Sequence, residues 1–195
     1  MTRLLDILIA SLGLALSSPV LVLAAMAIRA GSPGPVIYRH ERIGRHGKPF
    51  ELWKLRTMVQ GAETMGAGLY IEDRDPRITR TGRLLRRFSL DELPNLVNVL
   101  RGEMSIVGPR PTVREQVERY TEHQRRRLEV KPGITGWAQV NGRASLPWPE
   151  RIELDVWYVD NRSLRLDLRI LARTAVLLLS GRGLYSAELR QGWDD

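Results

Sequence analysis

The sequence of 195 residues contains no cysteine. This absence excludes disulfides, thiolate nucleophiles and cysteine-ligated zinc or iron–sulfur centres. Lysine is also scarce: Lys48, Lys54 and Lys131 are the only lysines among 30 basic residues, so arginine supplies most of the positive charge behind the formal net charge of +8. Arginine presents a planar fork of donors that suits phosphate oxygens. The composition therefore predicts a phosphate-bearing partner, which could be a nucleotide, an anionic lipid or a nucleic acid.

A length of 195 residues fits one domain of ordinary size and leaves little room for a second. The N-terminal part of the chain is almost uncharged, because Asp6 is the only charged residue between positions 4 and 28. At ~1.5 Å per residue, a helix of that length could cross a bilayer core of about 30 Å. The run is longer than the apolar part of a typical signal peptide. We therefore expect residues 1–30 to be a retained membrane segment.

Pro19 stands near the middle of this apolar run, directly after Ser17 and Ser18. A proline inside a helix removes a backbone donor and clashes with the preceding turn, and serine hydroxyls compete for nearby carbonyls, so we expect a kink. Each arm would then span about half of the hydrocarbon core, which suits a hairpin that enters and leaves by one face. Arg3 and Arg29 make both flanks basic, so the positive-inside rule does not assign them to opposite sides. From hydropathy alone, a kinked transmembrane helix is an equal alternative.

The rest of the chain predicts an α+β fold that is mostly helical. Two β-prone runs at residues 36–38 and 50–55, separated by a loop at 44–49, predict a hairpin with Lys54 on its second strand. In the last predicted helix, arginine recurs every fourth residue among apolar ones, which is typical of a helix that lies in a membrane interface. Helices are expected at residues 58–65, 112–129, 150–159 and 164–179.

Asp91 and Glu92 follow a series of arginines at positions 74, 77, 80, 83 and 86. Such a series ordinarily marks a solvated basic face, but its place directly before two carboxylates favours phosphate binding. Ser89 and Glu92 fit a capping box, which would put both acids in the first turn of a helix. Pro94 weakens this interpretation, because proline at the fifth helical position is costly. A helix that begins at Pro94, with both acids displayed in the preceding turn, is at least as consistent with the sequence.

Two adjacent carboxylates in such a turn have two chemical uses. They can bind a divalent metal through oxygen ligands, or one of them can attack phosphorus. Arg110 stands between Pro109 and Pro111 and is either a plain turn residue or a fixed phosphate clamp. Residues 131–143 form a glycine-punctuated loop that ends at Arg143 and is able to enclose a ligand.

Together these motifs resemble the monotopic polyprenyl-phosphate phosphoglycosyl transferases, the bacterial sugar transferase family. The resemblance covers nearly the whole chain, and the last residues alone are unmatched. It departs mildly at Leu55, at Glu103 and at His40, where an aromatic residue, aspartate and glutamine are more usual. The matching stretches are GPV (34–36), RIG (42–44), KLRTM (54–58), DPRIT (75–79), LLRR (84–87), SLDELP (89–94), NVL (98–100), MSIVGPRP (104–111), KPGITGWAQVNGR (131–143) and LDVWY (154–158).

The resemblance implies a compact catalytic domain at residues 31–195, surrounded by interfacial amphipathic helices and preceded by a re-entrant membrane helix broken at Ser18 and Pro19. It also implies a magnesium-dependent, two-step reaction. Asp91 would attack the β-phosphate of a UDP-sugar and release UMP, and polyprenyl phosphate would then take the phosphosugar. Glu92 would help to hold the metal with Asp91 or would activate the lipid phosphate. The residues that would bind the substrates are Lys54, Arg86, Arg110 and Arg143.

The partners implied by the resemblance are a UDP-sugar, a polyprenyl phosphate such as undecaprenyl phosphate, and a phospholipid membrane, with no nucleic acid. The expected location is the cytoplasmic face of the bacterial inner membrane, in an early step of glycoconjugate synthesis. A homodimer is the assembly to expect if the chain self-associates. The rival hypothesis is a basic membrane-surface scaffold or polyanion-binding module, which would bind polyanions with a steep salt dependence. That alternative would not need Asp91 and Glu92 beside a series of arginines.

Overall fold

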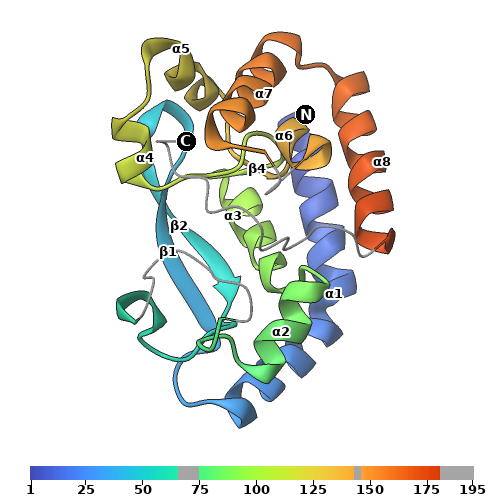
Figure 1. The fold of residues 1–195 in the computed structure, drawn as a ribbon. Helices are drawn as coiled ribbons and strands as arrows, with labels where there is room; N and C mark the ends of the chain where they lie inside the picture. The colour runs from blue at the N-terminus through green and yellow to red at the C-terminus, as the bar shows by residue number, and fades with distance from the viewer. Residues whose placement is uncertain (66–74, 143–145, 181–195) are drawn as a thin grey trace.

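The computed structural model describes residues 1–65, 75–142 and 146–180 (Figure 1). It confirms an α+β fold that is mostly helical. The helices are α1 (Arg3–Gly31), α2 (Arg80–Arg87), α3 (Asn95–Arg101), α4 (Arg114–Glu118), α5 (Glu122–Arg125), α6 (Trp137–Asn141), α7 (Trp148–Asn161) and α8 (Leu164–Ser180). Single 3₁₀ turns are η1 (Arg45–Gly47), η2 (Ala62–Thr64), η3 (Leu90–Glu92) and η4 (Arg126–Glu129), and the strands are β1 (Ile37–Ile43), β2 (Pro49–Leu55), β3 (Ser105–Val107) and β4 (Gly133–Thr135).

The predicted membrane segment is one helix, α1, which runs along most of the molecule (Figure 1). In the described part of the chain, it alone is long and apolar enough to cross a membrane. Pro19 lies inside it without ending it. The hydroxyl of Ser17 donates to the Gly13 carbonyl at 2.6 Å, and that of Ser18 donates to the Ala15 carbonyl at 2.8 Å. These are the serine-to-backbone bonds expected just before a helix-weakening proline.

Both halves of α1 contact the rest of the domain. In the N-terminal half, the buried carboxylate of Asp6 accepts from the hydroxyl of Ser105 at 2.9 Å and from the amide of Ile106 at 2.9 Å, both on β3. In the C-terminal half, Ile28 is buried in an apolar cluster with Leu55 and Leu85. Asp6, the only charged residue of the apolar run, therefore connects α1 to the domain through hydrogen bonds.

The predicted hairpin is confirmed and is longer than expected. Strands β1 and β2 pair antiparallel over seven positions, with Tyr38 opposite Lys54 and Arg42 opposite Phe50. Helix α3 lies between this hairpin and α1 (Figure 1). The buried Asn98 of α3 ties the layers together, because its side-chain oxygen accepts from the Trp53 amide at 3.1 Å and its side-chain nitrogen donates to the Glu51 carbonyl at 2.6 Å.

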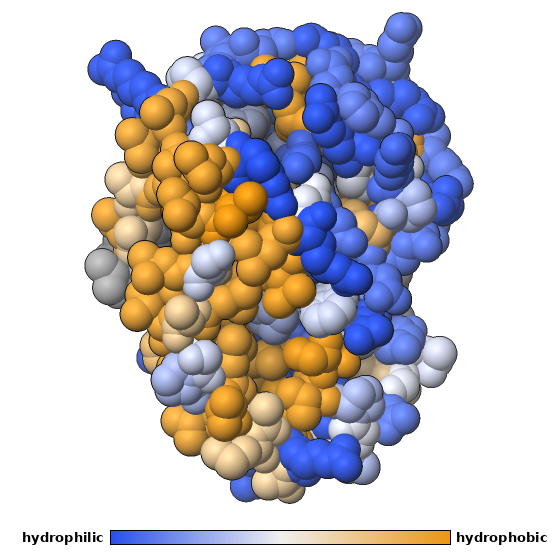
Figure 2. Space-filling view, turned by 180° about the vertical axis from the view of Figure 1, so that it is seen from behind, coloured by the Kyte–Doolittle hydropathy of each residue, from blue (hydrophilic) through white to orange (hydrophobic). Residues whose placement is uncertain are grey.

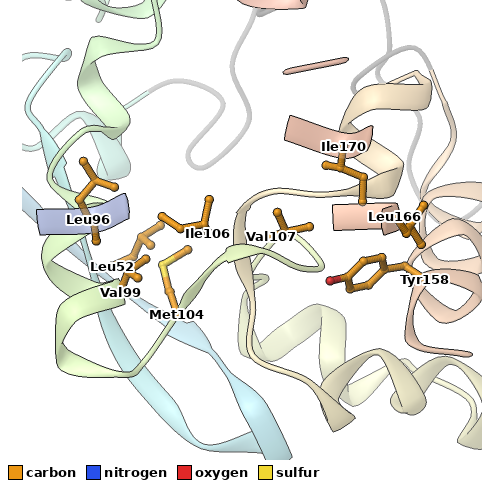
Figure 3. Close-up of a cluster of buried hydrophobic side chains, with 10 residues drawn as sticks. Leu52, Leu96, Val99, Met104, Ile106, Val107, Tyr158, Leu166 and Ile170 are labelled. Atoms are coloured by element: carbon orange, nitrogen blue, oxygen red, sulfur yellow. The ribbon is translucent and has the colours of Figure 1, made fainter. Parts of the chain in front are cut away.

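The main core lies where α1, α3, β2, β3 and α8 meet (Figure 3). Val99, Met104 and Ile170 are almost completely buried within it. Strands β3 and β4 form a short parallel pair in which Ser105 lies opposite Gly133. A Cβ atom on Gly133 would lie 2.1 Å from the amide nitrogen of Gly108, so only glycine permits this close approach of the two backbones. This approach brings two distant sequence motifs together.

Two helix predictions were wrong. Residues 58–65 form a β-bridge between Met58 and Ile78 followed by η2, because the Val59 amide bonds to the Arg77 carbonyl at 2.9 Å instead of to its own turn. Residues 112–129 form α4, α5 and η4 instead of one exposed helix, because Thr121 caps a new helix there. The two C-terminal helix predictions are confirmed by α7 and α8.

Exposed apolar side chains gather on one side of the molecule (Figure 2). The apolar surface follows α1, and exposed apolar residues of α2 and α8 add to it. A surface of this extent is larger than scattered apolar residues explain and marks a contact with another apolar phase. Large apolar residues that are more than half exposed in these segments include Leu4, Leu8, Leu12, Leu16, Val22, Leu23, Met26, Leu84, Phe88, Leu168 and Val176.

Candidate active site

The acidic pair lies in the 3₁₀ turn η3, between α2 and α3. Ser89, the N-cap of η3, adopts the left-handed conformation (φ 53°) and its side chain makes no cap, so the capping box is not formed. Pro94 is the N-cap of α3, which confirms the alternative in which both acids precede the helix. The tight turn directs Asp91 inward, where its side chain is 3% exposed.

Glu92 is held by two cations from distant parts of the chain. Its Oε1 accepts from Lys54 Nζ of β2 at 2.8 Å and from Arg110 Nη2, which follows β3, at 2.9 Å. The Glu92 side chain is 15% exposed. Burial by itself would raise the pKa of Glu92, but Arg110 and Lys54 outweigh it and hold that pKa well below its ordinary value. Glu92 is therefore ionised at neutral pH.

Asp91 is in a different electrostatic environment although it is the next residue. Burial raises the pKa of Asp91, Lys54 opposes this, and the negative charge of Glu92 adds to the increase. Adjacent carboxylates with pKa values shifted in opposite directions are typical of sites where the two acids have different roles. Asp91 is the more basic carboxylate and Glu92 is the fixed anion.

The arginine series does not form one phosphate-binding face. Arg77 is buried in an ion pair with Asp75 at 2.6 Å and donates to the Ala62 carbonyl at 2.9 Å, so its role is structural. Arg80 and Arg83 are exposed. Arg86 at the end of α2 turns toward the site, where its Nε donates to Thr57 Oγ1 at 2.8 Å and its charge lowers the pKa of Asp91. Positions 74 and 143, which include the predicted ligand-binding Arg143, lie outside the described residues.

Arg110 is fixed by more than its two flanking prolines. Its backbone carbonyl accepts from Nη2 of Arg127 at 2.9 Å. The same Nη2 lies 2.5 Å from Oδ2 of Asp155 on α7, and both side chains of this ion pair are 2% exposed. Arg127 also donates to the hydroxyl of Tyr120. No role for Arg127 was predicted from the sequence. The only sequence feature that pointed to this ion pair was the LDVWY motif, which contains Asp155.

The donor atoms of the acidic pair fit magnesium in its usual protein environment. Mg²⁺ prefers oxygen ligands and commonly takes one or two carboxylates together with substrate phosphates and water. Asp91 offers a buried oxygen ligand whose raised pKa a divalent cation would lower. Glu92 has a second oxygen besides the Oε1 that Lys54 and Arg110 share. Within the described ranges no cluster of three acidic or histidine ligands occurs, so substrate oxygens would have to complete the coordination.

Comparisons with known proteins give consistent results over the whole described chain. The family model described as bacterial sugar transferase matches residues 1–181. The sugar transferase EpsL of Bacillus subtilis is 47% identical over 182 residues, which cover 93% of this chain and 89% of that protein. The undecaprenyl-phosphate galactose phosphotransferase of Salmonella typhimurium is 40% identical over 94% of this chain and 41% of its own length. The UDP-glucose:undecaprenyl-phosphate glucose-1-phosphate transferase of Escherichia coli is 46% identical over 87% of this chain and 38% of its own length.

Proposed function

The chain belongs to the bacterial sugar transferase family, and we propose that it transfers a sugar 1-phosphate from a UDP-sugar to a polyprenyl phosphate and releases UMP. The observation that carries this proposal is the geometry of η3. A buried aspartate lies beside a glutamate that is held by Lys54 and Arg110, a few residues after the exposed apolar Leu84 and Phe88. Relatives named for this reaction with galactose and glucose match the chain through this region. A polyanion-binding scaffold would explain the charge but not the arrangement of the two acids.

The reaction divides into two displacements at one phosphorus atom. In the first, a carboxylate oxygen of Asp91 bonds to the β-phosphorus of the donor, and the bond from that phosphorus to the bridging oxygen breaks, so UMP leaves with both bonding electrons. In the second, an oxygen of polyprenyl phosphate bonds to the same phosphorus and the bond to Asp91 breaks. The product is a polyprenyl diphosphate sugar, and Asp91 is regenerated. Lys54, Arg86 and Arg110 stabilise the negative charge that is transferred in both steps.

Glu92 has a positioning role in this scheme. By accepting from both Lys54 and Arg110 at a single oxygen, it holds two cations from different elements within reach of the phosphates. Bound magnesium, with Asp91 and Glu92 as its protein ligands, would supply further neutralisation of phosphate charge. The shorter, buried Asp91 has fewer torsions to order before attack than Glu92, which supports its assignment as nucleophile.

The structure also supports monotopic attachment to the membrane, with the domain on one side of the bilayer. The two halves of α1 contact one domain, through Asp6 on β3 and through Ile28 beside Leu55. If this domain lies on one side of the bilayer, both ends of α1 lie on that side, as in a re-entrant helix. The apolar surface over α1, α2 and α8 would then rest in the interface, on the cytoplasmic face of the inner membrane where the nucleotide sugar is available. Self-association as a homodimer stays a prediction.

The proposal is tested with a panel of UDP-sugars, magnesium and polyprenyl phosphate, with UMP release and lipid-linked sugar as the two products measured. Donor labelled in the β-phosphate and supplied without lipid should leave label on the protein, and peptide mass analysis should map it to Asp91. Asp91→Asn should abolish labelling and turnover, whereas Asp160→Asn, at an exposed acid of α7, should change neither. Label on Glu92 would reverse the assignment of the nucleophile. Absence of UMP release with every UDP-sugar would refute the function.

A further inference from the structure

Three polar side chains of β1 share the hairpin face that carries Lys54. Directly opposed residues of antiparallel strands point to the same face, and Tyr38 lies opposite Lys54. Every second residue returns to that face, so His40 and Arg42 lie on it as well. The rings of Tyr38 and His40 have centroids 5.8 Å apart, and Arg42 Nη1 lies 3.0 Å from His40 Nε2. Tyr38, His40 and Arg42 therefore form a row of polar side chains that begins beside Lys54, the lysine that binds Glu92.

The far end of this row reaches the segment of Arg110. The amide of Ile43, which follows Arg42, donates to the carbonyl of Thr112 at 2.8 Å, and Thr112 is two residues beyond Arg110. Burial and the nearby positive charge of Arg110 lower the pKa of Arg42 to about 10. Arg110 thus forms an ion pair with Glu92 and is also close enough to Arg42 for the two guanidinium groups to repel each other. The positive potential extends beyond the acidic pair along the hairpin.

In the described part of the chain no carboxylate lies within ion-pair distance of Arg42, and Glu115 is the acid whose charge acts on it. None of the ion pairs found there includes it, although its side chain is partly buried. Its hydrogen bonds are the contact with His40 and a donation to the Glu41 carbonyl at 3.2 Å. Removing a guanidinium from water without a carboxylate in direct contact costs free energy, which an anionic ligand would recover. Arg42 has the environment of an anion-binding group.

The contact with His40 orients the Arg42 guanidinium. Arginine can only donate, so His40 Nε2 must accept, and it can do so only when the imidazole is neutral with its proton on Nδ1. A glutamine at position 40 could accept from arginine in the same way, through its side-chain oxygen. The pair therefore behaves as one unit in which position 40 supplies an acceptor and Arg42 supplies the charge.

We propose that Arg42, oriented by neutral His40, binds the α-phosphate of the UDP-sugar, the phosphate that leaves with UMP. This inference rests on the proposed function. Lys54, Arg86 and Arg110 surround the acidic pair, where the β-phosphate must lie for attack by Asp91. Arg42 lies close enough to Arg110 for their charges to interact, as the site of a second phosphate group bonded to the first requires. The subsite stabilises the charge that develops on the leaving group.

The inference is tested by comparing UMP with uridine as inhibitors of sugar transfer, because these two ligands differ only in the phosphate. In the wild-type enzyme UMP should inhibit at lower concentration than uridine. Arg42→Gln should weaken inhibition by UMP about tenfold or more, the loss expected for one charge-assisted contact, and leave uridine inhibition unchanged. Arg39→Gln is the matched control, because Arg39 is an exposed arginine on the opposite face of the same strand and should change neither constant.

Several outcomes would overturn the inference. UMP inhibition of Arg42→Gln equal to that of wild type would remove Arg42 from the phosphate site, and so would an equal loss for UMP and uridine. An increased KM for polyprenyl phosphate with unchanged UMP inhibition would assign Arg42 to the lipid acceptor instead. If Arg42→Gln does not fold, Arg42→Lys is compared in the same way. Inactive wild-type enzyme would instead refute the proposed function, so the two failures are distinguishable.

The role of His40 gives a second readout that a purely structural residue would not change. His40 is faced by Tyr38 and Arg42 on β1, Lys54 on β2, Glu63 of η2 and Glu115 of α4, and burial followed by the charge of Arg42 lowers its pKa. Protonation at low pH would remove the acceptor and add a like charge beside Arg42. The donor KM of wild type should therefore rise between about pH 8 and about pH 5. His40→Gln, which cannot titrate, should show a smaller rise, and an identical pH profile would exclude the orienting role.

Discussion

Replacing Arg127 and Asp155 together is expected to separate the stability of this protein from its activity. The two side chains form an ion pair that is 2% exposed on each side, between η4 and α7. Removal of one partner, as in Arg127→Met, leaves an uncompensated buried charge and should cost about 3–5 kcal/mol. A domain of this size has a total stability of about 5–15 kcal/mol, so the single variant should be strongly destabilised.

The double variant Arg127→Met/Asp155→Leu removes both charges. Buried ion pairs replaced by apolar residues of similar size often leave stability unchanged or increase it. This pair is a good candidate, because Nε of Arg127 and Oδ1 of Asp155 are buried and have no hydrogen-bond partner among the described residues. The double variant also removes the donor that holds the Arg110 carbonyl at 2.9 Å. We therefore expect recovered stability but a reaction barrier raised by about 1–3 kcal/mol, because a displaced Arg110 loses its charge-assisted contact with the phosphate.

Thermal unfolding in detergent and kcat/KM for the donor measure the two effects. The matched control is Arg126→Met/Asp160→Leu, which removes the neighbouring exposed ion pair between the same two elements. The control should change neither the melting temperature nor the activity to a notable extent, because exposed pairs contribute little. A double variant of Arg127 and Asp155 that is both stable and fully active would refute the idea that this pair positions Arg110.

Three further outcomes are expected from the site and from α1. Arg110→Lys keeps the charge but loses the fork, and should raise the barrier by about 1–3 kcal/mol; unchanged turnover would reduce Arg110 to a turn residue. Lys54 lowers the pKa of Asp91, so Lys54→Gln should raise that pKa and move the acidic limb of the activity profile to higher pH, whereas an unshifted limb would contradict the assigned contact. Thr2→Cys, the only cysteine in that variant, should resist impermeant thiol reagents applied outside intact cells, and efficient labelling would exclude the re-entrant arrangement.

Features that depend on a few neighbouring residues were predictable from the sequence. The long apolar run identified α1, and the alternation of β-prone runs with turn residues identified the hairpin. The cost of proline inside a helix correctly placed Asp91 and Glu92 in a turn before α3. These predictions succeeded because they depend on local geometry. Backbone clashes and the spacing of apolar side chains are both determined within a single helix or strand.

The same local patterns misled where a tertiary contact was stronger. The spacing of Arg77 suggested a phosphate-binding face, yet Asp75 neutralises it in the interior. Residues 58–65 have a helical pattern, yet the Val59 amide donates to the Arg77 carbonyl on a neighbouring segment. In each case a segment distant in the sequence satisfies a polar group: the Ala62 carbonyl accepts from the Arg77 guanidinium, and the Arg77 carbonyl accepts from the Val59 amide. The free energy of satisfying these groups exceeds helix propensity.

The sequence by itself determined the long apolar helix, the hairpin, the C-terminal helices and the place of Asp91 and Glu92 in a turn before α3. The tertiary structure alone decided which cations surround that pair, because Lys54 and Arg110 meet at one oxygen of Glu92 from positions 38 and 18 residues away. It also decided that Arg127 holds the Arg110 backbone and that Arg42 shares the hairpin face of Lys54. Charge interactions act through space and carry no periodic signal along the chain, so their partners become known only when the elements are packed.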